Sequence, residues 1–214
     1  MRRLPNVRRR LVRVALVAAL AAALAAATAA CSQQTPLVSP TGRWQAFTDQ
    51  AHGFSLRIQE PFRGAEVGDE RGVWTAHIYI SGASRDPRGE VNELTITATR
   101  TSAKERIEAD RLIDIAPAMT AEIVAAERRA GARDIAIEQP LQPLLVSRYR
   151  GLEMLYQRHV PQAGTLLKSD VLVVVNGDWL LRFTITGDEA FWESGGPAAR
   201  GFVETLSLFE PRPG

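Results

Sequence analysis

Two apolar segments joined by Asn176-Gly177 constrain the fold of this chain more than any other feature. Residues 166–175 are largely apolar, and residues 179–186 alternate between apolar and polar side chains. Asn and Gly tolerate the positive φ angles of tight hairpin loops, so the dipeptide is a strong turn signal. The pattern predicts an antiparallel hairpin over residues 171–185, central to a sheet that helices cover on both faces.

Short strand-like runs account for much of the remaining chain. A first hairpin is predicted where His52-Gly53 separates two alternating segments, and a charged, glycine-bearing loop is predicted on each side of the strand at residues 73–80. The two predicted loops cover residues 63–72 and 81–92. The other predicted strands cover residues 44–47, 54–58, 94–99, 135–138, 145–150 and 152–159.

One long helix and one final helix complete the prediction. Ser102 and Glu105 form a capping-box pattern, and apolar residues then recur at spacings of three and four as far as Gly131. Pro117 interrupts this apolar face and predicts a kink or a restart of the helix. The final helix is predicted to begin near Pro197. This order of elements predicts an α+β fold with a mainly antiparallel β-sheet flanked by helices.

The single cysteine, Cys31, follows a basic and then apolar leader. Six arginines and no acidic residue occupy the first thirty positions, and residues 14–30 are rich in alanine. The segment resembles a bacterial lipoprotein signal peptide that ends in a lipobox. The resemblance implies removal of residues 1–30, lipidation of Cys31 and attachment to a membrane outside the cytoplasm. An ordinary secretory signal and a retained membrane anchor are the alternatives that the leader leaves open.

Removal of the predicted leader changes the net charge of the remaining chain, and the leader also determines the predicted division of the sequence into parts. The predicted parts are a signal peptide at 1–30, a lipidated tether at 31–42, a folded domain at 43–210 and a tail at 211–214. The chain has 26 basic and 24 acidic residues, so removal of the six leader arginines leaves 20 basic against 24 acidic. No nucleic-acid partner is therefore expected. Because no second cysteine is present, disulfides and thiolate sites within the domain are excluded.

Three sequence elements resemble PsbP-like domains. They are Phe47-Thr48-Asp49 with Gly53-Phe54-Ser55-Leu56 and Pro61, the segments 171–175 and 180–184 around a tight turn, and Phe202-Val203-Glu204-Thr205-Leu206. Bacterial lipoproteins of the mycobacterial LpqN type are similar, since they carry this domain behind a lipobox. The resemblance implies a PsbP-like α/β/α sandwich. It supplies no invariant catalytic set, so no residue inherits a role from it.

The strand at residues 73–80 holds the candidate binding residues, Trp74, His77 and Tyr79. Two long loops on a rigid sheet are predicted to flank this strand, and such loops are where recognition usually resides. His77 has two interpretations, a structural histidine with satisfied hydrogen bonds or a contact to a ligand. His52 is interpreted as a turn residue.

Other polar groups leave the choice of function open. Arg148, Arg150 and Arg158 form either an ordinary polar strand surface or a patch that contacts an anion. No histidine has a partner at metal-ligand spacing and no serine elbow is present, so no catalytic, cofactor-binding or metal-binding residue is predicted and no cofactor is expected.

The function predicted from these features is a non-catalytic, membrane-tethered binding or assembly module of the bacterial cell envelope. Its expected partners are the membrane, through the lipid anchor, and an envelope protein or a small-molecule ligand. The alternative is a small-ligand carrier or a hydrolase with a site built from the two loops.

Overall fold

A seven-stranded antiparallel sheet lies at the centre of the structure, which is a computed structural model. In order across the sheet, its strands are β3 (Phe62–Glu70), β4 (Val73–Ile80), β5 (Glu93–Arg100), β9 (Trp179–Gly187), β8 (Thr165–Asn176), β7 (Tyr149–Val160) and β6 (Arg133–Val146). The structure describes residues 44–59, 62–70, 73–80, 92–101, 107–161, 165–194 and 200–212. Cys31 and the predicted leader and tether lie outside these residues.

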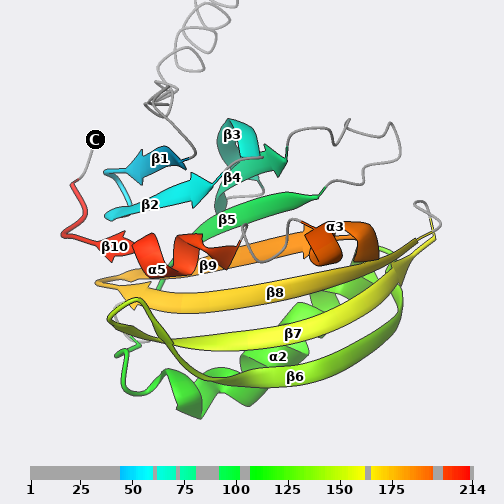
Figure 1. The fold of residues 1–214 in the computed structure, drawn as a ribbon. Coiled ribbons are helices and arrows are strands. Elements are labelled where there is room, and N and C mark those ends of the chain that lie inside the picture. Colours follow the sequence, from blue (N-terminus) through cyan, green and yellow to red (C-terminus); the bar gives the residue numbers. More distant parts are fainter. Residues whose placement is uncertain are drawn as a thin grey trace, which may run out of the picture. The chain divides into compact units, whose positions relative to one another are not determined.

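A smaller sheet, one long helix and short helices complete the fold (Figure 1). The small antiparallel sheet contains, in order, β1 (Trp44–Asp49), β2 (Phe54–Gln59) and β10 (Ser207–Leu208). The helices among the described residues are α2 (Leu112–Arg129), α3 (Glu189–Ser194) and α5 (Phe202–Thr205). The predicted α+β class with a mainly antiparallel sheet is confirmed.

Two hydrophobic cores lie on opposite faces of the seven-stranded sheet. The first core lies between the large sheet and the elements β1, β2, α3 and α5. In it, the ring centroid of Phe183 is 5.7 Å from that of Phe54 and 5.5 Å from that of Phe202. The second core lies under α2, where Leu112 and Ile123 pack on β7 and β8. The prediction that helices cover both faces of the large sheet is therefore wrong for one face. On the face of the first core, the small sheet provides much of the cover.

The predicted central hairpin is confirmed, with a different turn. β9 is the fourth of the seven strands, and Val171 lies in register with Thr184. Because Asn176 pairs with Trp179, the two loop residues are Gly177 and Asp178, not Asn176 and Gly177. Gly177 has a φ of +61° and Asp178 has a negative φ, which is the pattern of a type II′ turn.

Asn176, the last residue of β8, connects three segments instead of forming the turn. Its Nδ2 group donates hydrogen bonds to the carbonyl oxygens of His52, Gly53 and Phe209 at 3.1, 2.8 and 2.9 Å. The segment after β10 therefore meets the β1–β2 turn and the end of β8 at one side chain.

The predicted loop at residues 63–72 is wrong, because residues 62–70 form strand β3. This strand pairs with β4 from Glu70 and Val73 to Phe62 and Ile80. Among the described strands β3 pairs with β4 alone, and charged residues are common on edge strands because they discourage pairing with other chains. Its composition therefore looks like that of a loop. The other predicted loop lies outside the described residues except for Asn92.

Strand β6 differs from the predictions for this part of the chain, which were two separate strands at residues 135–138 and 145–150. The predicted strand at 145–150 is broken by a turn at Ser147, whose φ is +55°, and the strand before it extends back through Pro140 and Pro143. β6 is the other edge of the large sheet, and its pairing with β7 is irregular at three places. Proline is tolerated there because an edge strand has N–H groups without a ladder partner.

The helix predictions are correct in type and inaccurate in extent. α2 begins at Leu112, well after the predicted cap at Ser102, which lies outside the described residues, and it ends before Gly131 as predicted. It continues through Pro117. The predicted start of the final helix near Pro197 lies outside the described residues. α5 covers four residues, because Leu206 leaves the helix and the chain then joins the small sheet as β10. α3 is not predicted by the sequence pattern.

Candidate functional site

The structure places Trp74 and His77 on opposite faces of β4. Trp74 packs in the first core, with its ring centroid 4.6 Å from that of His52 and 6.0 Å from that of Phe54. His77 faces the α2 side of the sheet. Tyr79 lies in register with Glu93 of β5, and its side chain is outside the described part of the chain. A ligand on one face of β4 therefore meets only one member of the Trp74–His77 pair.

Two carboxylates hold the imidazole of His77. Nδ1 lies 3.0 Å from Glu93 Oε2, and Nε2 lies 2.9 Å from Glu70 Oε1. The hydrogen bond with Glu93 is the main reason that the pKa of His77 is raised from 6.5 to about 9, burial opposes the rise, and Glu70 adds to it. At neutral pH both ring nitrogens therefore carry protons and donate to the carboxylates.

We expect His77 to remain charged through neutral pH. In an NMR titration its ring protons should shift with a midpoint near pH 9. Because the raised pKa belongs to the folded state, the stabilisation by His77 is complete below about pH 6.5 and is lost as the pH rises to about 9. Glu93→Gln should lower the midpoint more than Glu70→Gln, since the Glu70 side chain is 62% exposed and that of Glu93 is 22% exposed. A midpoint below 7 in the unmodified protein would contradict this assignment.

A polar hollow lies beside His77, between α2 and the strands β5, β9, β8 and β7. It has a volume of about 260 Å³. Its lining residues are Glu93, Thr95, Ile123, Ala126, Glu127, Ala130, Tyr156, Arg158, Val171, Arg182, Thr184 and Thr186. Glu93 belongs both to this lining and to the His77 contact, so the histidine and the hollow form one connected polar surface.

One side of this hollow is formed by hydrogen bonds and an ion pair between strand residues and α2. Arg158 donates to Ser169 Oγ at 2.6 Å, and its Nε lies 2.8 Å from Glu127. Ser169 also bonds to Thr186 at 2.9 Å, and the Tyr156 hydroxyl donates to Glu127 at 2.5 Å. Burial raises the pKa of Tyr156, so its hydroxyl remains protonated. The network holds its side chains in fixed positions on rigid strands.

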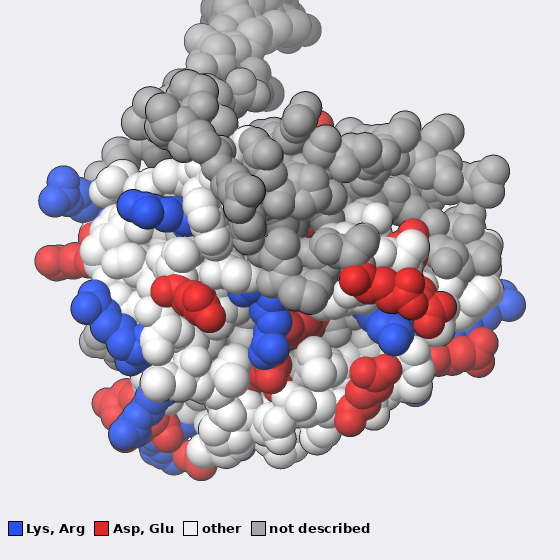
Figure 2. Space-filling model, in the orientation of Figure 1, with Lys and Arg blue, Asp and Glu red and all other residues white. Residues whose placement is uncertain are grey.

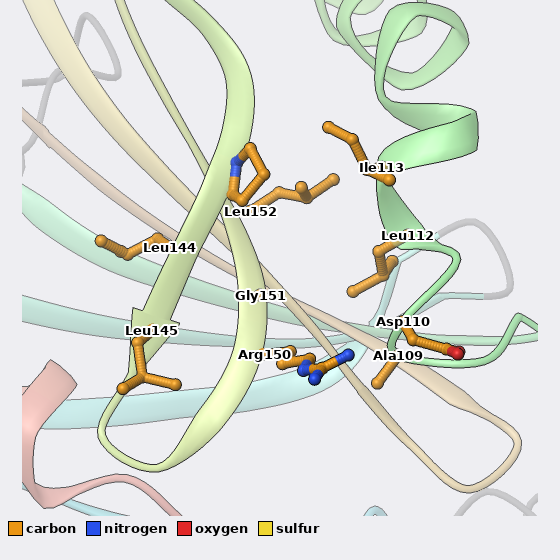
Figure 3. Close-up of a pocket in the computed structure, with 10 residues that line it drawn as sticks. Ala109, Asp110, Leu112, Ile113, Leu144, Leu145, Arg150, Gly151 and Leu152 are labelled. Atoms are coloured by element: carbon orange, nitrogen blue, oxygen red, sulfur yellow. The ribbon is translucent and has the colours of Figure 1, made fainter.

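A second hollow is mainly apolar and lies at the start of α2 (Figure 3). It has a volume of about 390 Å³. Leu144, Leu145 and Leu152 lie on the strand side, and Leu112 and Ile113 lie across from them on α2. The residues Leu145 and Ile113 are 63% and 44% exposed, so this hollow presents apolar surface to the solvent. It is suited to an apolar group of a partner or ligand.

A buried acidic pair lies on the opposite face of β7 and β8. Arg200 contacts Glu153 and has its Nε 3.1 Å from Asp170 Oδ2. Burial is the main cause that raises the pKa of Asp170 from 3.8 to about 7, Glu153 adds to the rise, and Arg200 opposes it. Such a pKa suits proton transfer, but the Asp170 side chain is only 2% exposed. Because a substrate cannot reach Asp170 in this structure, we interpret the contact of Arg200 with Asp170 and Glu153 as stabilising the fold.

The remaining candidates do not form a joint site. His52 is a turn residue as predicted, and it is also buried, with Nδ1 3.0 Å from Asp49 and its ring 4.4 Å from that of Trp179. Arg158 lies at the polar hollow and Arg150 at the apolar one, eight residues along β7 and thus about 26 Å away. Arg148 stacks on Tyr149 at 5.4 Å. The three arginines therefore form no common anion patch.

Sequence reasoning missed Arg182, which lines the polar hollow. The available signal is its position: it stands between Leu181 and Phe183, both fully buried, on the strand predicted to be central. An arginine on the second face of a central strand needs either a partner or solvent access. The alternation of residues thus indicates a polar opening there, but not which residues from other strands surround it.

The charges on the rest of the surface are mixed. Figure 2 shows Lys, Arg, Asp and Glu interspersed over the face drawn, without a field of one sign. Within the described ranges, no helix is both long and apolar enough to cross a bilayer.

Solved structures with a similar fold are found. The solution structure of cyanobacterial PsbP (CyanoP) from Synechocystis sp. PCC 6803 matches with a TM-score of 0.53 at 13% identity, over 81% of this chain and 99% of that chain. LpqN of Mycobacterium tuberculosis, which is involved in cell envelope biogenesis, matches with a TM-score of 0.39 at 8% identity, over 83% of this chain and 87% of that chain. No family model matches the sequence, and no curated protein matches it significantly.

The likeness to the cyanobacterial protein confirms the predicted PsbP-like fold. The match extends over nearly the whole of that protein, so it concerns the complete architecture and not one motif. At 13% identity it shows the fold alone, since one fold supports many functions.

Proposed function

We propose that this chain is a non-catalytic, membrane-tethered binding or assembly module of a bacterial cell envelope. The face of the sheet that carries His77 and the polar hollow is the proposed recognition surface. The observation that carries the proposal is the connection of these two features through Glu93, because it places charged and hydroxyl groups together on rigid strands. Sites of this construction suit binding, since little ordering is required when the partner arrives.

Tethering is supported by the leader that ends at Cys31. A lipid on this residue would hold the domain at a membrane outside the cytoplasm, with residues 32–42 as a polar spacer that contains two prolines. The distance from the membrane would be set by this spacer. Stable anchoring by acyl chains needs more than one chain, which diacylation of a lipoprotein cysteine provides.

We expect the mature protein to begin at a lipidated Cys31. Mass spectrometry of the N-terminal peptide from a membrane fraction should show a diacylated cysteine and no residues 1–30. Cys31→Ala should shift the protein to the soluble fraction or stop its processing, whereas Ser32→Ala, the neighbouring control, should leave both unchanged. An unmodified Cys31 in membrane-bound protein, or a mature start at another residue, would reject the tether.

Partner capture should depend on His77. Crosslinking of the full chain in intact envelopes should give discrete products that His77→Ala removes and His159→Ala retains, because His159 lies on the other face of the sheet at β7. Tyr79→Ala, two positions further along the same strand, should also reduce these products. Trp74→Ala is expected to reduce stability through its core contacts. Hydrolytic activity that disappears in a stable His77→Ala variant would contradict a binding-only role.

The alternative function, a small-ligand carrier, is favoured by one observation. The polar hollow of about 260 Å³ is close to the lower end of the range for small-molecule pockets, which is about 300 Å³. The two proposals differ in what copurifies with the protein. A bound small molecule in native mass spectra would favour the carrier, and a crosslinked envelope protein would favour the assembly module.

A further inference from the structure

We propose that the polar hollow binds the anionic group of a small ligand, a carboxylate or a phosphate, through Arg182. The inference deepens the proposed function, on which it rests, by naming the ligand chemistry that this face of the sheet would select. It depends on three features of the hollow: a half-buried arginine and two hydroxyl groups that have no partner among the described residues, and acidic residues whose charges are already balanced.

Arg182 lies on the central strand of the large sheet, and its buried neighbours in sequence determine the face to which its side chain points. Leu181 and Phe183 are fully buried in the first core, so the alternation of β9 turns Arg182 toward the hollow on the other face. Arg182 lies in register with Thr97 on one side and Val173 on the other. It makes no hydrogen bond or ion pair with any residue that the structure describes. A half-buried guanidinium in this condition favours an anion that enters the hollow.

Two threonines add hydrogen-bond donors at the same place. Thr95 of β5 and Thr184 of β9 lie directly opposite each other in the antiparallel register, and both line the hollow. Neither hydroxyl bonds to another described residue, in contrast to Thr186, which bonds to Ser169. Arg182 and Thr184 are two positions apart on one strand and thus on one face. The guanidinium and the two hydroxyls can therefore meet oxygen atoms of one ligand group.

The acidic residues of the hollow are balanced by other partners. Glu127 lies against Arg158 and accepts a hydrogen bond from the Tyr156 hydroxyl. Glu93 accepts a hydrogen bond from His77, which is charged at neutral pH. These contacts reduce the repulsion that both carboxylates would exert on an anion. Of the two arginines in the lining, Arg158 is neutralised by this network and Arg182 is not, so the positive charge available to a ligand is that of Arg182.

The size of the hollow limits the ligand. A volume of about 260 Å³ accommodates a compact molecule or the anionic end of a larger one. The apolar contribution of Ile123, Ala126 and Val171 on the α2 and β8 sides suits a short hydrocarbon portion next to the anionic group. The expected ligand is thus a small organic acid or a phosphate ester.

The test is a titration of the full mature protein with two probes, acetate and inorganic phosphate, while chloride keeps the ionic strength constant. The NMR signals of the Arg182 Nε–H group and of the Thr95 and Thr184 amides should shift with a saturable dependence on one or both probes. The stronger probe identifies the ligand group. Arg182→Gln should weaken binding at least about tenfold, as expected for loss of a hydrogen bond to a charged group.

Matched variants separate this site from general charge effects. Arg150→Gln removes the same charge at the apolar hollow and should bind both probes as the unmodified protein does. Thr184→Val keeps the shape, removes one hydroxyl and should weaken binding several-fold. If Arg182→Gln fails to fold, the double variant Thr95→Val/Thr184→Val is the test, and it should bind the probes more weakly than the unmodified protein. Absence of a saturable shift with both probes, or unchanged binding by the folded Arg182→Gln protein or by the double variant, would overturn the inference.

The proposed function and this inference fail in different ways. A protein that is lipidated at Cys31 and gives His77-dependent crosslinks, yet binds neither probe, contradicts the anion site alone. A protein that binds a probe through Arg182 but lacks the lipid contradicts the tether alone.

Discussion

Gly53→Ala should lower the free energy of unfolding by about 3 kcal/mol or more, from left-handed backbone strain and from overpacking. Gly53 has a φ of +71°, and an added Cβ would lie 2.3 Å from the carbonyl oxygen of Phe209 and 2.6 Å from Asn176 Nδ2. The backbone of Phe209 donates to the Gly53 carbonyl at 2.8 Å, so moving that segment away breaks this bond as well. Urea unfolding followed by circular dichroism measures the loss.

Gly177→Ala is the matched control for this prediction. Gly177 has a similar φ of +61°, and nothing lies within 4 Å of the position that its Cβ would occupy. The substitution therefore has the backbone cost without the overlap, about 1–2 kcal/mol. Equal losses in the two variants would show that the contact between the β1–β2 turn and the C-terminal segment contributes little to stability.

Asp170→Asn should stabilise the protein at about pH 8, although Asp170 is part of an ion pair. Its pKa of about 7 lies above the value of 3.8 for an unperturbed carboxyl, so the folded state holds the proton more tightly than the unfolded state. The contribution of Asp170 to stability therefore falls as the pH rises from about 4 to about 7, by up to about 4 kcal/mol. The neutral amide avoids this cost, so the two proteins should differ little at about pH 4.

Arg200→Gln is the control with the opposite sign. Loss of its guanidinium leaves Asp170 and Glu153 without a positive partner, so this variant should be less stable than the unmodified protein at about pH 8. The same variant should approach the unmodified protein at low pH, where Asp170 is protonated. An Asp170→Asn protein that is destabilised equally at both pH values would contradict the raised pKa.

Local patterns were sufficient for the central part of the fold. The β8–β9 hairpin was predictable because β8 is buried on both faces and β9 alternates around Phe183. Edge strands were not predictable in the same way. β3 and the proline-containing part of β6 are strands because a neighbour pairs with them, and this pairing is a tertiary contact that composition does not encode.

The candidate site was predictable in part, for a related reason. The strand that carries His77 could be recognised from its alternation, but the carboxylates that hold the imidazole are 7 and 16 residues away in sequence. Their approach requires the registers β3–β4 and β4–β5. Likewise, Arg182 and Thr95 come from strands far apart in sequence that become neighbours only when β5 pairs with β9.

The three hydrogen bonds of Asn176 connect segments that are far apart in sequence, and this affects how late in folding they can form. They join residues 124, 123 and 33 positions apart, so the bonds to His52 and Gly53 cannot form before residue 176 is in place, and the bond to Phe209 cannot form before the segment after β10 is in place. Contacts this distant in sequence slow folding because loop closure precedes the stabilisation that they bring. If the chain is exported unfolded, as we propose from the leader, Asn176 can fix the first hairpin only after residue 176 has crossed the membrane.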